Sequence, residues 1–456
     1  MKKLLFMLAT VAILAVSCDR SSDDLKTVQV SVSLEMDGWA VPTTTKADGS
    51  SDFHWVSKAD RPVKLKDLNS SAIYDGITDA TGTAVFNVLP GIYEASSTFS
   101  VTSEVEVTLF NGLASNLNVT AGSDKYFKLA LKRSKSNAII IKEFYLGGCP
   151  KDDGSGAFTQ DRYVILYNNS AEKVDASNIC FAFIGSNSNA ANILKGLIDE
   201  EGNLVYEKEG MIPAMHGVWR FNTTVEIEPY SQIVVAVTGA IDHTKTYNLS
   251  VNLANSAYYA MYDPESGYNI ANMYPAPDTS VPTTNYLKAT KYGSGTGWTI
   301  SVSSPAFFIF NKAGIHEYAS NIDNRDTRGM FEGAKIPFEW IVDGVEVFLR
   351  GADDKNTKRL TANVDAGNVQ HTNKLGYSIY RNVDKAATEA IEGNKDKLVY
   401  GYAGGTKDID VEGGTTDPSG IDAEKSIANG AKIVYVDTNN STNDFHERVF
   451  ASLTGK

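Results

Sequence analysis

The sequence contains few of the residues from which reactive sites are usually built. Its 456 residues include three cysteines and six histidines, and no two histidines lie two or four positions apart. The patterns HExxH, CxxC, GxSxG and the phosphate-binding P-loop are all absent. Each of those patterns gathers a nucleophile, a metal ligand set or a phosphate cradle locally. The sequence therefore predicts no cofactor, no metal centre and no enzyme.

Basic residues are outnumbered. The chain has 42 Lys and Arg against 55 Asp and Glu, a net charge of −13. Binding to nucleic acid depends on neutralising phosphates with Lys and Arg, so we expect no nucleic-acid partner. Beyond the first 17 residues no apolar run approaches the roughly 20 residues that a helix needs to cross a bilayer. The rest of the chain is therefore expected to contain no membrane-spanning helix.

The N-terminus has the features of a secretion signal. Lys2 and Lys3 precede an uncharged apolar stretch, residues 4–15, which is too short to span a bilayer but typical of a signal-peptide core. One interpretation is an ordinary secreted protein cleaved near Ser17. The other starts from the sequence LAVSC, Leu14 to Cys18, which resembles the bacterial lipobox. That resemblance implies a lipoprotein signal peptide at 1–17, a fatty-acylated Cys18 and a tether at 18–26.

The tether, CDRSSDDLK, is acidic and polar. It resembles the signal that directs Bacteroidetes lipoproteins to the outer leaflet of the outer membrane. The resemblance implies a protein anchored to the cell outer membrane and exposed at the surface or facing the periplasm. Its first partner would be the lipid bilayer, in which two or more acyl chains hold a protein firmly whereas one holds it weakly.

Residues 27–135 are expected to form a β-sandwich. In the stretch TVQVSVSLEM the apolar residues alternate from Val28 to Leu34, a period of two. Further on, the stretch from Ile77 to Ala95, ITDATGTAVFNVLPGIYEA, places turn residues between short extended runs. This pattern resembles the prealbumin-like or carboxypeptidase-regulatory-like repeat, although the second proline of that pattern is absent. The resemblance implies an Ig-like sandwich that serves as a stalk or spacer.

Residues 136–456 are expected to form a second sandwich. The motifs VDAS at 174–177, IEPY at 227–230 and GYSIYR at 376–381 resemble the lamin-tail domain. Together with the lipobox and the first module, the chain resembles the uncharacterised DUF4876 family of Bacteroidetes lipoproteins. The resemblance implies an all-β architecture of two Ig-like sandwiches in tandem. Long insertions separate the motifs at about 186–216, 241–296 and 390–430.

Within the insertion at 241–296, the stretch 256–278 carries five tyrosines among Pro, Gly and Asp. Tyrosine in a polar loop offers a rigid amphipathic contact surface. The alternative is a loop folded back on the sandwich with its tyrosines half buried. The tyrosines of this candidate binding surface are Tyr258, Tyr259, Tyr262, Tyr268 and Tyr274.

Two further groups of residues deserve a structural test. With Cys18 acylated, Cys149 and Cys180 remain, and they form either a disulfide or two buried thiols. In the last strand region, Asp437, Asn439, Ser441 and Asn443 have the 1, 3, 5, 7 spacing of a calcium loop. However, the turn glycine and the bidentate glutamate of such a loop are missing, so a plain turn is expected.

These observations favour a cell-envelope lipoprotein that acts as a non-enzymatic binding or adaptor module. Its partners would be a surface glycan or protein, or a TonB-dependent transporter. Two alternatives remain open, a purely structural surface spacer and a secreted hydrolase of glycans or phosphoesters. The hydrolase requires carboxylates or histidines that converge in a cleft.

Overall fold

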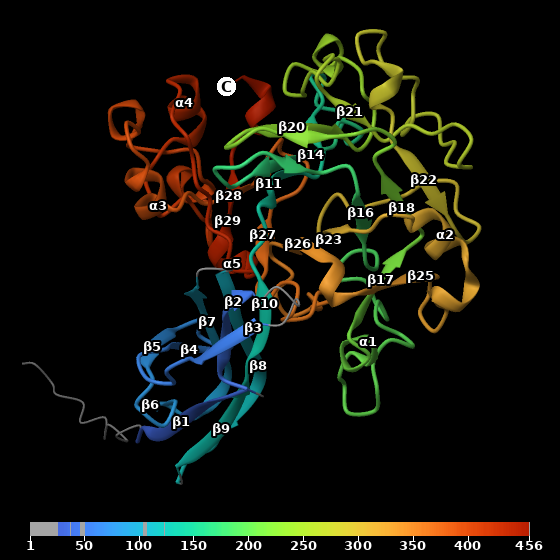
Figure 1. The fold of residues 1–456 in the computed structure, drawn as a ribbon. Coiled ribbons are helices and arrows are strands. Elements are labelled where there is room, and N and C mark those ends of the chain that lie inside the picture. Colours follow the sequence, from blue (N-terminus) through green and yellow to red (C-terminus); the bar gives the residue numbers. More distant parts are fainter. Residues whose placement is uncertain (1–25, 37, 46–50, 104–106, 123, 456) are drawn as a thin grey trace, which may run out of the picture.

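The computed structural model describes residues 26–455 apart from 37, 46–50, 104–106 and 123. The predicted signal peptide and Cys18 lie outside the described residues. Among the described residues, no helix is long and apolar enough to cross a membrane. The fold is all-β, as predicted, and it consists of a smaller sandwich attached to one corner of a larger one (Figure 1).

The first sandwich is formed by residues 28–135. Its smaller sheet has the order β6-β1-β9, with strands β1 (Val28–Glu35), β6 (Thr83–Val88) and β9 (Lys125–Ala130). Its larger sheet has the order β10-β8-β7-β4-β5, with strands β10 (Lys132–Lys135), β8 (Val107–Val119), β7 (Gly91–Thr102), β4 (Pro62–Asp67) and β5 (Ile73–Ile77). A separate hairpin joins β2 (Ala40–Thr45) and β3 (Ser51–Trp55).

The core of the first sandwich follows the period-two pattern of its sequence. The predicted inward face of β1 is confirmed, because its four alternating apolar side chains, Val28, Val30, Val32 and Leu34, are all buried. Strand β8 is long and continuous, since its antiparallel pairing with β7 carries the backbone through Asn111 and Gly112.

The second sandwich consists of two six-stranded sheets. One has the order β21-β20-β14-β11-β28-β29, with strands β11 (Ile139–Tyr145), β14 (Tyr163–Asn168), β20 (Gln232–Ala236), β21 (Tyr259–Ala260), β28 (Ser378–Arg381) and β29 (Phe445–Arg448). The other has the order β22-β18-β16-β23-β26-β27, with strands β16 (Ile179–Phe183), β18 (Gly217–Arg220), β22 (Lys288–Lys291), β23 (Ala306–Asn311), β26 (Ile341–Leu349) and β27 (Val369–His371).

Short elements complete the second sandwich. The remaining strands are β12 (Cys149–Pro150), β13 (Ala157–Phe158), β15 (Val174–Asp175), β17 (Met211–Met215), β19 (Glu226–Ile227), β24 (Arg325–Asp326) and β25 (Gly333–Pro337). The helices are α1 (Val205–Lys208), α2 (Ile315–Ser320), α3 (Lys385–Ala390), α4 (Ala423–Ala428) and α5 (Ser441–Asp444). The 3-10 turns are η1 (His243–Lys245), η2 (Thr283–Asn285), η3 (Ile322–Asn324), η4 (Phe338–Trp340), η5 (Lys395–Lys397), η6 (Thr406–Ile409) and η7 (Ser452–Thr454).

The insertions between the sequence motifs cover the outer faces of the second sandwich. The central core lies between the two sheets, where the rings of Phe144 and Phe307 approach to 4.5 Å between centroids. Segment 186–216 packs a further core on the outer face of the sheet that contains β16. Segments 241–296 and 390–430 pack on the outer face of the sheet that contains β11. Both faces of these central strands are therefore dry, which explains their continuous apolar sequences.

Candidate functional site at the junction of the two sandwiches

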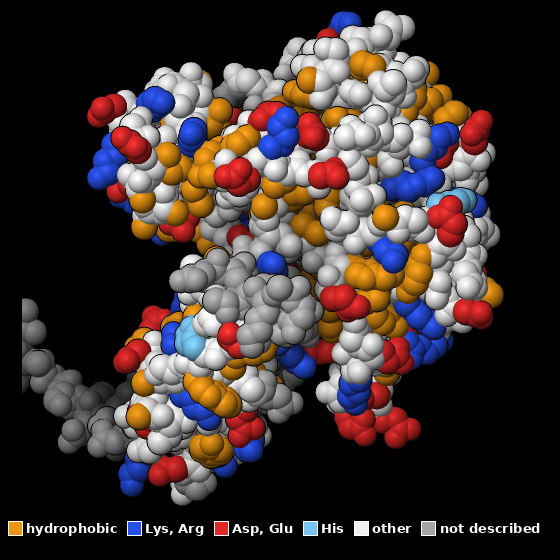
Figure 2. Space-filling model, viewed as in Figure 1, with side chains coloured by type: hydrophobic (Ala, Val, Ile, Leu, Met, Phe, Trp, Pro, Cys, Tyr) orange, Lys and Arg blue, Asp and Glu red, His pale blue; other side chains and the backbone are white. Residues whose placement is uncertain are grey.

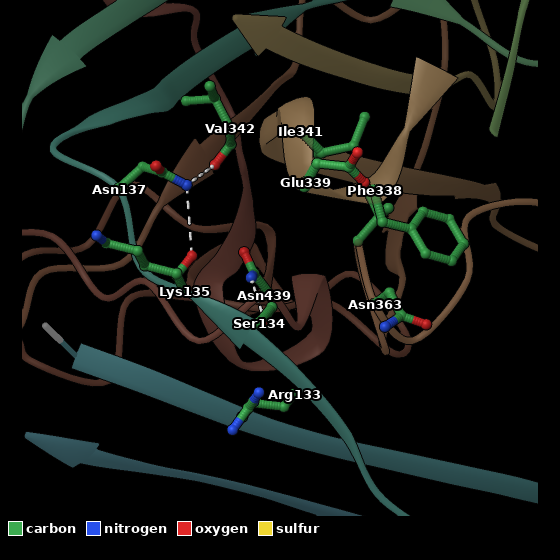
Figure 3. Close-up of a pocket in the computed structure, with 11 residues that line it drawn as sticks. Arg133, Ser134, Lys135, Asn137, Phe338, Glu339, Ile341, Val342, Asn363 and Asn439 are labelled. Carbon is green, nitrogen blue, oxygen red and sulfur yellow. Dashed lines mark hydrogen bonds between the residues drawn. The ribbon is translucent and has the colours of Figure 1, made fainter. Parts of the chain in front are cut away.

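A cavity of about 360 Å³ lies where the two sandwiches meet (Figure 3). Side chains from β10, from the turn η4, from the start of β26 and from three loops line it. The lining residues are Arg133, Ser134, Lys135, Asn137, Phe338, Glu339, Ile341, Val342, Asn363, Val364 and Asn439. In Figure 3, Lys135 and Asn137 lie across the cavity from Phe338, Glu339 and Asn363. Pockets that bind small molecules commonly occur at such domain junctions and have about this size.

The amide side chains of the cavity are held by hydrogen bonds that use their N–H groups. Asn137 Nδ2 donates to the carbonyl oxygens of Val342 at 2.9 Å and Lys135 at 3.3 Å. Asn439 Nδ2 donates to Ser134 Oγ at 2.8 Å. The carbonyl oxygens of both amides accept no hydrogen bond from the described residues. Two acceptors therefore remain for a ligand.

Donors remain as well. Arg133 is exposed, and its Nη1 donates to the carbonyl oxygen of Ala40 at 3.1 Å, which leaves other guanidinium N–H groups unused within the described chain. The half-buried side chain of Asn363 makes no hydrogen bond to the described residues. Arg133 therefore brings unused charged donors to the cavity, and Glu339 is the one carboxylate among the lining residues. Charged donors form their strongest hydrogen bonds with ionised acceptors, so Arg133 favours an anionic group on the ligand.

The segment with calcium-loop spacing forms one wall of this junction and docks the second sandwich onto the first. Asp437 accepts a hydrogen bond from Ser136 Oγ at 2.6 Å, and the Thr438 carbonyl accepts one from Asn111 Nδ2 at 2.7 Å. Asn440 Nδ2 donates to Thr98 Oγ1 at 2.8 Å. The contacts of Thr438 and Asn440, with that of Asn439 to Ser134, join the second sandwich to the first.

The four side chains with calcium spacing do not converge on a common point. Asn439 reaches Ser134, and Ser441 Oγ donates to Asp365 at 2.6 Å. Asp437 pairs with Arg381, whose Nη1 lies 3.4 Å from Asp437 Oδ1. In the described part of the chain, no three His, Cys, Asp or Glu side chains are grouped as a metal would require. The turn therefore serves interdomain contact.

Behind the docking segment lies a buried cluster in which one arginine faces three carboxylates. Arg381, the last residue of the GYSIYR motif, is fully buried and forms an ion pair with Asp343. Its Nη1 also lies 3.4 Å from Asp437 and 3.6 Å from Asp444. Burial raises the pKa of Asp343 to about 7 and that of Asp444 to about 8, against the opposing influence of Arg381. These carboxyls belong to the fold and do not line the cavity.

The five tyrosines of the predicted binding surface lie elsewhere and pack inward. Tyr268 is buried, and its hydroxyl donates to the His216 carbonyl oxygen at 2.8 Å. The other four are half buried, packed against the central core or the outer core formed by 241–296, and are Tyr258, Tyr259, Tyr262 and Tyr274. The structure thus supports the folded-back alternative, in which the rings act as packing groups and their loop seals the sheet.

The two remaining cysteines are free thiols, which corrects the disulfide alternative. Cys149 lies in β12 and Cys180 in β16, and both side chains are fully buried. Burial raises the pKa of each thiol to about 12. Because the thiolate is the reactive form, neither cysteine is poised as a nucleophile.

The histidines are also dispersed. His446 is buried, and its Nδ1 pairs with Asn382 Oδ1 at 2.8 Å while its Nε2 pairs with Tyr402 Oη at 2.7 Å. Burial lowers its pKa to about 3, with a further contribution from Arg448. This ring is neutral at ordinary pH, and both its nitrogens are already occupied by the fold.

Comparison with known proteins gives a match of part of the chain to one family model and a few similar solved structures. Residues 228–397 match the model of DUF4876, a family described as a protein of unknown function. No curated protein matches the chain. A DUF4876 family protein from Bacteroides thetaiotaomicron is similar in structure, with 20% identity, a TM-score of 0.45, and coverage of 92% of this chain and 94% of that one.

Two further solved structures are similar to smaller parts of this chain, about a third of its length in each case. A DUF3823 family protein from Parabacteroides merdae has 9% identity and a TM-score of 0.15, with 35% of this chain and 67% of that chain covered. A DUF1812 protein from Bacteroides thetaiotaomicron has 17% identity and a TM-score of 0.16, with 33% and 58% covered.

Proposed function

We propose that this chain is a DUF4876 lipoprotein of the outer membrane that binds a ligand without catalysis, in the cavity between its two sandwiches. The lipobox-like sequence and the family-model match over residues 228–397 support the location and the family. The observation that carries the binding function is the cavity itself. It combines the unused N–H groups of Arg133, unused amide oxygens and a half-buried ring, Phe338, around one cavity.

The chemistry of the lining favours an acidic oligosaccharide. Arg133 supplies charge-assisted donors for a carboxylate or sulfate, which form stronger hydrogen bonds than neutral donors. The side-chain oxygens of Asn137 and Asn439 can accept from sugar hydroxyls, and the amide of Asn363 can both donate and accept. The ring of Phe338 offers an apolar wall.

Catalysis is not favoured by this lining. Glycoside hydrolysis ordinarily uses two carboxyl groups that flank the scissile bond. Glu339 is the single carboxylate among the cavity residues, and the nearby Asp343 and Asp437 are committed to Arg381. A binding module fits this arrangement better than a hydrolase, and an anchored spacer would need no such cavity.

The binding proposal is tested by calorimetric titration with oligogalacturonate, and with neutral dextran oligomers as the comparison. We expect oligogalacturonate to bind and both Arg133→Ala and Asn363→Ala to weaken binding about tenfold or more, since hydrogen bonds to charged groups contribute about 1.5–3 kcal/mol. Lys64→Ala, an exposed cation on β4 outside the cavity, is the matched control and should leave affinity unchanged. Failure of the wild-type chain to bind any acidic oligosaccharide, or equal binding by all three variants, would overturn the proposal.

The location is tested separately. Cys18→Ala should release the protein from membranes into the soluble fraction, because the acyl chains would be lost. Continued membrane association of that variant would contradict the lipid anchor. Purification of the acylated chain from outer membranes should also show whether a TonB-dependent transporter accompanies it, which would extend the binding role to that of an adaptor.

A further inference from the structure

The hairpin of β2 and β3 carries two aromatic side chains that the fold leaves exposed. Trp55 is 78% exposed, more than any other large hydrophobic side chain among the described residues, and Phe53 is 59% exposed. The two residues are two positions apart on β3, so their rings project from the same face of the hairpin. Hydrophobic side chains are visible on the surface of the first sandwich in Figure 2.

The outward face of the hairpin is a contiguous apolar surface. In the register of β2 with β3, Trp55 lies opposite Ala40, and Phe53 lies opposite Pro42. Side chains that are directly opposite on antiparallel strands share a face, with about 5 Å between their Cβ atoms. We refer to Phe53 and Trp55, with Ala40 and Pro42 beside them, as the aromatic platform.

The aromatic platform is not needed to hold the hairpin on the sandwich. The opposite face of the hairpin does so, because Trp39 and Val41 are buried in the first core. The ring of Trp39 also stacks on that of Phe99, with 6.5 Å between the centroids. Exposed tryptophan is typical of binding surfaces, where a few aromatic residues contribute most of the affinity. The outward rings therefore indicate a contact with a ligand.

The aromatic platform lies beside the cavity. Arg133 lines the cavity, and its Nη1 donates to the carbonyl oxygen of Ala40 at 3.1 Å. Because Ala40 and Trp55 are paired, with about 5 Å between their Cα atoms, the Cα of Trp55 lies within about 11 Å of this guanidinium nitrogen. In Figure 1 the hairpin lies next to β10, at the end of the first sandwich that meets the second. Arg133 thus belongs to the cavity and also touches the strand that borders the platform.

The chemistry of the two neighbouring sites is complementary to one kind of ligand. The face of an aromatic ring carries partial negative charge and attracts positively polarised C–H groups. A pyranose ring presents C–H groups on its faces and hydroxyl groups at its rim, so it can stack on such a ring. The unused donors of Arg133 favour a carboxylate nearby. An acidic sugar chain satisfies both sites at once.

We infer that Phe53 and Trp55 form a sugar-stacking subsite that extends the cavity, and that the ligand is an acidic oligosaccharide of several residues. This inference rests on the binding function proposed above. A single sugar held at Arg133 leaves the platform uncovered, whereas an oligosaccharide reaches both. Joining the two contacts in one ligand makes the second contact intramolecular and raises the affinity without any rearrangement of the protein.

The first experiment is calorimetric titration of the full chain with galacturonic acid and with hexagalacturonate. Trp55→Ala removes the stacking ring, and Trp55→Phe retains a ring at the same position. Tyr126→Ala is the matched control, because Tyr126 is a 58% exposed aromatic residue on β9 in the other sheet of the same sandwich. Urea denaturation should show that all three variants fold like the wild type, since each change lies at an exposed position.

We expect Trp55→Ala to weaken hexagalacturonate binding about threefold to tenfold and to leave the affinity for galacturonic acid unchanged. Trp55→Phe should retain most of the hexagalacturonate affinity, and Tyr126→Ala should retain all of it. Wild-type affinity of Trp55→Ala for hexagalacturonate would overturn this inference and leave the cavity proposal intact. A wild-type chain that binds neither ligand would refute the proposed function and this inference together.

The second experiment tests whether the sugar covers the ring of Trp55. The fluorescence that is lost in Trp55→Phe belongs to Trp55, and acrylamide quenches an exposed tryptophan by collision. Saturating hexagalacturonate should reduce the quenching of this component, whereas neutral dextran oligomers should not. If the ring stays as accessible to acrylamide in the presence of hexagalacturonate as in its absence, the sugar does not stack on Trp55. That result would overturn the inference even where Trp55→Ala weakens binding.

Discussion

The two sandwiches differ in how completely they bury their apolar side chains. In the first, β1 alternates between buried and exposed positions. Of the sixteen exposed large hydrophobic side chains among the described residues, nine lie between residues 53 and 126. In the second, every residue of β11, β14 and β16 is buried, because insertions cover both outer faces. The first sandwich thus leaves apolar surface to its surroundings, whereas the second encloses apolar groups and charges alike.

The largest expected effect follows from the charges enclosed in the second sandwich. Arg381→Met would leave Asp343, Asp437 and Asp444 without their cation in a buried site. Removing one partner of a buried ion pair typically costs about 3–5 kcal/mol, and we expect a loss of this size in the free energy of unfolding. Urea denaturation of the variant measures it, and hydrogen exchange should assign the loss to β11 and β28, with the amides of β1 unaffected.

The matched control for Arg381→Met is Lys173→Met. Lys173 pairs with Glu226 and Glu228 on the surface, and its side chain is 46% exposed. Exposed ion pairs contribute about 0–1 kcal/mol, so this variant should remain close to the wild type. Similar losses for the two variants would contradict the distinction between an enclosed and an exposed ion pair.

A smaller effect is expected from pH. The pKa of Asp444 is raised to about 8 by burial, from an ordinary value of 3.8 in the unfolded chain. The folded chain therefore binds more protons than the unfolded chain between these values. The resulting stabilisation is fully present below about pH 4 and is lost as the pH rises through about 8. A tenfold difference in a proton dissociation constant corresponds to about 1.4 kcal/mol.

Asp444→Asn removes this titration. Other titrating groups also change the free energy of unfolding with pH. One of them is Glu447, whose pKa is held near 2 by hydrogen bonds despite its burial. The informative quantity is therefore the difference between variant and wild type in the free energy of unfolding at pH 5 and at pH 8.5. The variant should lose stability at pH 5 and recover at least about 1.4 kcal/mol of that loss at pH 8.5. A difference that does not change with pH would show that Asp444 remains ionised in the fold.

The sequence predicts these two regions unequally. Alternation from Val28 to Leu34 is a direct signal of a half-buried strand, and the inward face of β1 was predicted residue by residue. The tyrosines of 256–278 were harder to interpret. A polar loop that covers a sheet has the same composition as a loop that binds a partner, and only the packing of Tyr268 and Tyr274 against Trp219 separates the two.

The candidate site could not be predicted from the sequence. Arg133, Phe338, Asn363 and Asn439 are far apart along the chain, and they meet only because the turn at 437–440 docks onto β7, β8 and β10. The same turn showed a calcium-like spacing, which reflects the frequency of Asn, Asp and Ser in turns. A spacing rule tests ligand order along the chain, but it does not test whether the side chains point to one centre.

The smallest expected effect concerns Ile77, an exposed residue on β5, and compares it with a buried residue of the same sandwich. Ile77→Thr retains a β-branched side chain at a position that is 61% exposed, so the free energy of unfolding of the unanchored chain should change by no more than about 0.5 kcal/mol. Val32→Thr is the matched substitution at a fully buried position of the same sandwich, where a buried hydroxyl should cost about 1–3 kcal/mol. Urea denaturation of both variants gives the comparison. If Ile77→Thr destabilises as much as Val32→Thr, Ile77 belongs to the folded core and the outward face of β5 is not a free surface.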